Sequence, residues 1–153
     1  MAEKEKEETS YRMEGIAFGL ADGTILCLGL TIGVAKATSN TNLVIISGII
    51  GGIANAFGNS IGLFMSQSAE RGLQIHETVE HGVPTRIHSK MEVLTSSVLS
   101  FMATIVALII LLSPFAFLNM TDAVLTTFSF GTILSFILGN YVGKLNRENP
   151  YKT

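Results

Sequence analysis

The residue with the clearest chemical potential is a single aspartate inside a long apolar stretch. Residues 15–35 contain no charged side chain other than Asp22. An aspartate at the centre of a membrane span costs roughly 2.5 to 3.5 kcal/mol, and such residues often mark an ion or proton path. We therefore expect Asp22 to handle a cation or a proton. The alternative is a protonated side chain that only hydrogen-bonds a neighbouring helix.

Two asparagines in the next apolar stretch are predicted to lie near this aspartate. If the chain turns near Asn40, Asn59 lies about as far beyond the turn as Asp22 lies before it, because both helices have the same rise per residue. Asn55 lies one turn away on the same face. Oxygen ligands suit hard divalent cations, so Asp22, Asn55 and Asn59 could form a metal site. An interhelical hydrogen-bond clasp is the competing interpretation.

A second polar cluster lies between two apolar stretches, within residues 67–92. His76 and Glu80 are four residues apart, as are Glu77 and His81. On a helix such pairs share one face, where they can chelate a divalent metal or simply hydrogen-bond. The candidate metal ligands of this segment are Glu70, His76, Glu77, Glu80 and His81.

The elements that hold these residues are predicted to be membrane helices. Charged residues form only 14% of the 153-residue chain, against about a quarter in an average soluble domain. Apolar runs of about 20 residues suffice to cross a bilayer as helices. We therefore expect an all-α polytopic membrane protein whose membrane domain, residues 14–143, has four transmembrane helices. Their approximate bounds are 14–35, 43–66, 93–117 and 121–143.

Basic residues predict how these helices are oriented. Nine of the ten Lys and Arg residues precede the first span, lie between the second and third, or follow the fourth, and only Lys36 does not. The positive-inside rule then places the N-terminal tail (1–13), the 67–92 loop and the C-terminal tail (144–153) in the cytosol. The charged N-terminal run is expected to be a solvated, disordered tail. The segment 81–86 is expected to end any helix that continues from the second span.

Glycines repeat at intervals of four in the first two spans, as at Gly15, Gly19 and Gly23. This spacing lets helix backbones approach closely, so we expect the first two spans to pack tightly, against each other or against a second copy. The sequence has no phosphate-binding loop, no nucleophile elbow and no CxxC motif. It also lacks the basic patch of a nucleic-acid-binding protein. We expect neither an enzyme nor a resident cofactor, and no nucleic-acid partner.

The segments "GLADG" (19–23) and "GVAKA" (33–37), preceded by Arg12, resemble the vacuolar iron transporter family, in a reduced archaeal or bacterial form. The second span, which ends in "SQSAER" (66–71), also matches the family pattern. This resemblance implies a proton-coupled exporter of ferrous iron, often accepting manganese, that forms a homodimer with its path near the twofold axis. It assigns Asp22 to metal and proton movement. It places the family's acidic metal-collecting segment at Glu70, Glu77 and Glu80.

The chain departs from the family pattern at several positions. Asn59 stands where better-known members carry a metal-binding methionine, Gly51 where they carry a glutamate, and Gly15 at a second acidic position. Family members usually have five spans rather than four, and a longer cytosolic segment. The hypothesis is an integral membrane exporter of ferrous iron or manganese, in the plasma membrane of a prokaryote or a vacuolar or organellar membrane of a eukaryote. The alternatives are a non-transporting membrane scaffold or subunit, and a small-cation channel.

Overall fold

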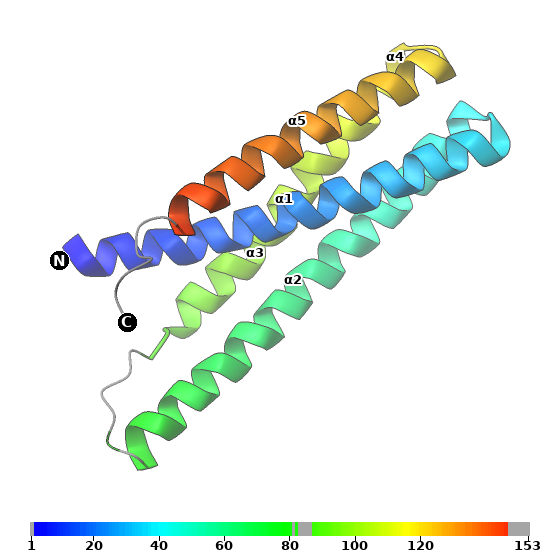
Figure 1. The fold of residues 1–153 in the computed structure, drawn as a ribbon. Helices are drawn as coiled ribbons and strands as arrows, with labels where there is room; N and C mark the ends of the chain where they lie inside the picture. Colours follow the sequence, from blue (N-terminus) through cyan, green and yellow to red (C-terminus); the bar gives the residue numbers. More distant parts are fainter. Residues whose placement is uncertain (1, 81, 83–86, 147–153) are drawn as a thin grey trace.

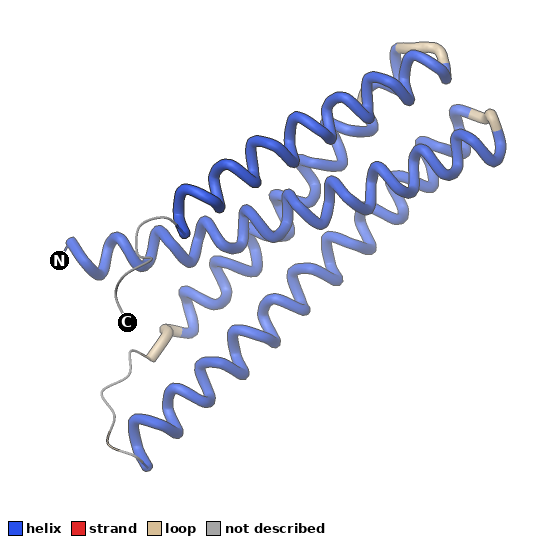
Figure 2. The backbone as a smooth tube through the Cα atoms, viewed as in Figure 1, coloured by secondary structure: helices blue, strands red, loops and turns tan. Residues whose placement is uncertain are grey.

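In the computed structural model, residues 2–80, 82 and 87–146 are described, and they form helices joined by short loops (Figures 1 and 2). The four helices that are long and apolar enough to cross a membrane confirm the predicted all-α class. The helices in chain order are α1 (Ala2–Thr38), α2 (Thr41–Glu80), α3 (Lys90–Leu112), the short α4 (Pro114–Phe117) and α5 (Met120–Asn146).

The first two long helices are joined by a tight turn at the position expected from the sequence. Only Ser39 and Asn40 separate α1 from α2. The Asn40 side chain caps the start of α2, because its Oδ1 accepts hydrogen bonds from the backbone amides of Asn42 and Leu43 at 3.0 and 3.3 Å. From this turn the two helices separate toward their opposite ends (Figure 1).

The helices extend beyond the apolar spans that the sequence marks. Helix α1 begins at Ala2, so most of the N-terminal tail expected to be disordered is helical. Helix α2 continues to Glu80, so the first half of the expected 67–92 loop is helical as well, in spite of Gly72. Glutamate and lysine favour helix in water as strongly as most apolar residues do. The helices therefore continue beyond the apolar spans at both ends. Most of the predicted breaker segment, at 81 and 83–86, lies outside the described residues.

Helix α3 fills the space between α1 and α2. A Cβ atom placed on Gly15 would lie 2.2 Å from the Ser96 carbonyl oxygen, and one on Gly19 would lie 2.1 Å from that of Ser100. The backbones of α1 and α3 therefore touch along this glycine stripe. The close partner of Gly15, Gly19 and Gly23 is thus α3, and not the second span or a second copy as the glycine spacing led us to expect.

The second helix packs on the same central helix through its own small residues. A Cβ on Gly52 would meet the Leu108 side chain at 2.6 Å, and one on Gly48 would meet Leu112 at 2.7 Å. On the far side, α5 is joined to α3 by a hydrogen bond from Thr127 Oγ1 to the Leu111 carbonyl at 2.9 Å. The buried core lies among these contacts: Cys27, Ala35, Val44, Leu108, Leu111, Leu112, Phe115 and Ala123.

Candidate functional site

The aspartate in the first span meets the second span through Asn55. The Asn55 Nδ2 group donates a hydrogen bond to Asp22 Oδ2 at 2.8 Å, and both side chains are half-buried. An amide that donates through its nitrogen keeps its carbonyl oxygen as an acceptor. The pair therefore presents carboxylate and amide oxygens together, between α1 and α2, within a stretch of α1 that carries no other charge.

Asn59 lies one turn further along α2 and faces a different helix. Its Nδ2 group donates to Thr104 Oγ1 of α3 at 3.2 Å. The Thr104 hydroxyl in turn lies 3.1 Å from the Gly19 carbonyl oxygen of α1. The expected trio of Asp22, Asn55 and Asn59 is thus divided between two places. Helices α1 and α2 separate with distance from their turn (Figure 1), and Asn59 hydrogen-bonds α3 rather than α1.

The helix faces that carry the Asp22–Asn55 pair include glycines with open space beside them. Gly29 and Gly33 follow Asp22 by about two and three helical turns, and Gly62 follows Asn55 by about two, so each glycine lies on the face of its polar partner. Among the residues that the structure describes, no atom lies within 4 Å of a Cβ placed at the following positions: Gly29, Gly33, Gly58 and Gly62. Glycines that nothing in the described chain covers therefore flank the pair on both helices, beside the exposed Phe18 and Ile25 of α1.

The metal-ligand candidates on the far end of α2 are mostly exposed. His76 Nδ1 lies 3.4 Å from Glu80 Oε1, as their spacing predicts, and both side chains are more than half exposed. Glu77 is exposed as well. His81, the expected partner of Glu77, lies outside the described residues. Glu70 points away from this group, toward His88 at the start of α3.

His88 joins three helices, and the sequence reasoning did not include it among the candidate ligands. Its buried ring packs against Tyr11 of α1, with ring centroids 4.2 Å apart, and Nε2 hydrogen-bonds the Tyr11 hydroxyl. Glu70 Oε1 lies 3.7 Å from Nε2, and Glu92 Oε2 lies 4.0 Å from Nδ1. Arg71 donates to the His88 carbonyl oxygen at 2.8 Å. The sequence did contain a sign of this position: Ser89 and Glu92, directly after His88, form a capping box that marks the start of α3.

Polar side chains continue from His88 into the protein between α2 and α3. Gln67 donates to Ser96 Oγ at 3.2 Å, and Ser96 donates to the Tyr11 carbonyl oxygen at 3.1 Å. Three buried polar atoms of this region make no hydrogen bond with any residue that the structure describes: Gln67 Oε1, His88 Nδ1 and Ser100 Oγ. These side chains connect the ends of α1, α2 and α3 to the level of Asn59 and Thr104.

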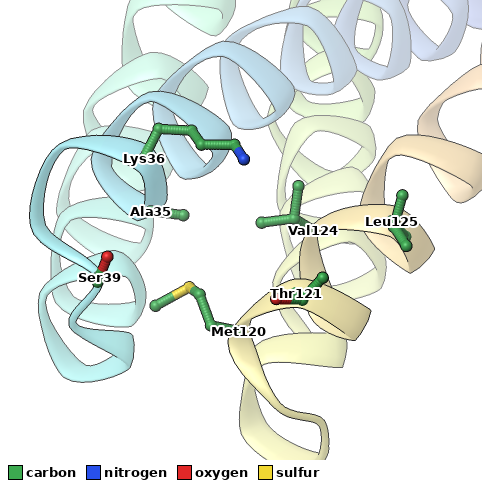
Figure 3. A pocket seen from close by; sticks show the side chains of 7 residues that line it. All are labelled: Ala35, Lys36, Ser39, Met120, Thr121, Val124 and Leu125. Atoms are coloured by element: carbon green, nitrogen blue, oxygen red, sulfur yellow. The ribbon is translucent and has the colours of Figure 1, made fainter.

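Two further arrangements bear on what the chain can bind. In the described ranges, 2–80, 82 and 87–146, no three His, Cys, Asp or Glu side chains gather as a metal-binding group. At the opposite end of the bundle from His88, a cavity of about 240 Å³ separates the end of α1 from the start of α5 (Figure 3). Lys36 extends over this cavity, and Val124 points into it. A cation would be repelled there by the lysine.

Comparison with known proteins agrees with the geometry of the first two spans. Residues 13–79, in α1 and α2, match the VIT family. An uncharacterized protein of the archaeon Methanocaldococcus jannaschii is 27% identical over 143 residues, which cover 88% of this chain and 74% of that protein. No solved structure matches the chain significantly. With its four apolar helices the chain is an integral membrane protein, and the family match implies membrane transport of a metal ion. The resemblance predicted from the sequence is therefore confirmed: the first two spans are similar to the VIT family, and the archaeal relative agrees with a reduced archaeal-type form.

Proposed function

We propose that this protein exports a divalent metal ion, ferrous iron or manganese, from the cytosol in exchange for protons. The observation that carries the proposal is the Asp22–Asn55 pair, held 2.8 Å apart between two membrane helices. Carboxylate and amide oxygens are the ligands that hard divalent cations take. The match to the VIT family supports metal transport by the same two helices.

In this proposal Asp22 couples the two flows. The carboxylate binds the metal when it is deprotonated and takes a proton when the metal has left, so one side chain cannot carry both at once. Asn55 supplies a neutral oxygen to the metal. Asn59 has its amide hydrogen-bonded to Thr104, and we assign it to holding α2 on α3 rather than to binding the metal.

A second copy of the chain would cover the face on which this pair lies. A half-buried carboxylate that faced lipid tails would be costly, and membrane proteins turn such groups toward protein or water. Small residues at Gly29, Gly33 and Gly62 would let a partner helix approach closely. We therefore propose a homodimer through α1 and α2, in which twofold symmetry brings two Asp22–Asn55 pairs to one interface.

The exposed end of α2 would collect the metal on the cytosolic side. The nine-to-one distribution of basic residues supports this orientation, with both termini in the cytosol. Helix α2 would then carry Glu70, His76, Glu77 and Glu80 beyond the membrane. Of these, Glu70 lies beside the buried His88, although its side chain is about as exposed as those of His76 and Glu80.

Flux into proteoliposomes tests the proposal. We expect Mn²⁺ and Fe²⁺ transport that saturates and depends on a pH gradient. Losing a group that only hydrogen-bonds a metal ligand lowers activity roughly 10- to 100-fold. Asp22→Asn removes a proposed ligand itself, so it should reduce the flux by more than this. Asp122→Asn is the matched control, because Asp122 is an exposed carboxylate in the first turn of α5.

The remaining outcomes separate the alternatives. Flux that persists without a pH gradient and does not saturate would indicate a channel. Absence of flux in the unaltered protein would indicate a scaffold. Equal flux in Asp22→Asn and the unaltered protein would remove Asp22 from the mechanism.

A further inference from the structure

A second cavity lies between α2 and α3, near the ends of these helices that the His88 segment connects. Its volume is about 350 Å³, and it is lined by Phe64, Ser68, Arg71, Lys90 and Val93. Two of these five side chains are cations, one is a hydroxyl, and the other two are apolar. The lining thus combines positive charge and a hydroxyl hydrogen-bond donor with apolar side chains.

Both cations line the same cavity. Arg71 is fixed by the hydrogen bond from its Nε to the His88 carbonyl, which uses one of the five N–H donors of a guanidinium group. Lys90 is exposed and begins α3, where the helix dipole adds partial positive charge.

The nearby carboxylates are held by other partners. Glu92 accepts a hydrogen bond from the Ser89 amide at 2.8 Å, and Glu70 accepts one from Gln74 at 3.2 Å. Neither carboxylate lines the cavity. The cavity itself is therefore basic, and it would repel the metal ion that the transport site attracts.

The position of the cavity along the helices matches the edge of a membrane. Residues 37–69 carry no charge, and Glu70 and Arg71 are the first charged residues after this run. Phe64 and Val93 thus belong to the apolar part of the helices, whereas Arg71 and Lys90 belong to the level of lipid headgroups. Basic pockets between membrane helices at this level bind anionic headgroups.

We propose that this cavity binds the phosphate of an anionic phospholipid. Arg71 and Lys90 bind the phosphate oxygens, the Ser68 hydroxyl donates to one of them, and an acyl chain lies against Phe64. The volume is at the lower end of the roughly 300–1,000 Å³ found for small-molecule pockets, so it accommodates a headgroup while the chains remain outside. The site does not depend on metal transport.

The test is native mass spectrometry of the full-length protein released from vesicles that contain equal amounts of phosphatidylglycerol and phosphatidylcholine. The unaltered protein should retain phosphatidylglycerol preferentially. One lysine near an anionic lipid surface contributes attraction that corresponds to about a fivefold change in binding, so Lys90→Gln should lower this preference about fivefold. Arg71→Lys, which keeps the charge, should retain most of it.

Lys36→Gln is the matched control. Lys36 is the single cation among the residues that line the cavity between the end of α1 and the start of α5. The Lys36→Gln variant should change the preference by less than Lys90→Gln does. An equal loss in both variants, or no loss in Lys90→Gln, would overturn the proposal. Release of the lipid by millimolar inorganic phosphate alone would also overturn it, because the site would then select free phosphate rather than a lipid.

Discussion

Replacing Gly19 by alanine tests whether the contact between α1 and α3 holds the protein together. The added Cβ would lie 2.1 Å from the Ser100 carbonyl oxygen and 2.9 Å from two further backbone atoms of Ser100. Backbone cannot move aside as a flexible side chain does, so the two helices must separate. Overpacking of this kind costs about 1–3 kcal/mol. Separation would also weaken the hydrogen bond from Thr104 to the Gly19 carbonyl, worth about 0.6 kcal/mol between membrane helices.

One term opposes this loss. Alanine is the better helix former by about 1 kcal/mol, so the expected net destabilisation of Gly19→Ala is about 1–2 kcal/mol. Unfolding in sodium dodecyl sulfate, followed by circular dichroism, measures the difference. Gly139→Ala is the matched control, since no described atom lies within 4 Å of its added Cβ, and it should be neutral or stabilising. If both variants were equally stable, the close approach of α1 and α3 would be refuted.

Three further predictions address the other contacts. His88→Ala should lower the free energy of unfolding by about 2 kcal/mol, because it removes a buried partner of Tyr11. Its control, His76→Ala at an exposed position, should change this free energy by less than about 0.5 kcal/mol. Equal effects in denaturant titrations would exclude a role for His88 in joining the helices. Asn59→Ala should cost about 0.6–1 kcal/mol through the lost bond to Thr104, and a neutral result in the same titration would show that this bond contributes nothing. Gly62→Leu should leave the helix content of the monomer unchanged and weaken the dimer, as energy transfer between labelled copies in vesicles would show; unchanged transfer would place the dimer interface elsewhere.

The sequence was sufficient for the number of membrane helices and for the two helices that hold the Asp22 site. Long runs without charge marked the four spans, because burial in lipid demands apolar side chains over a fixed length. The short hairpin indicated that Asn55 and Asn59 lie near Asp22, but the residue count placed Asn59 level with the aspartate, whereas Asn55, one turn closer to the hairpin, makes the hydrogen bond. The helix ends were not predictable from hydropathy, since glutamate and lysine continue a helix into water.

Contacts that depend on a third helix could not be obtained from a single span. The spacing of Gly15 and Gly19 indicates that some backbone approaches closely, but it does not say which helix does so. The partner of Asn59 depends on how far α1 and α2 separate, which a count of residues from the turn does not contain. The contacts of His88 could not be predicted from the sequence because its partner Tyr11 lies on a helix far away in the chain.

The central claim is that the Asp22 carboxylate exchanges a proton for a metal ion. Infrared difference spectroscopy of the protein in lipid, recorded before and after addition of Mn²⁺ at a pH where the carboxyl is protonated, tests this claim most directly. Metal binding should remove a protonated-carboxyl band and produce a carboxylate band, and both changes should be absent in Asp22→Asn and retained in Asp122→Asn. The same difference spectrum in Asp22→Asn as in the unaltered protein would contradict the claim.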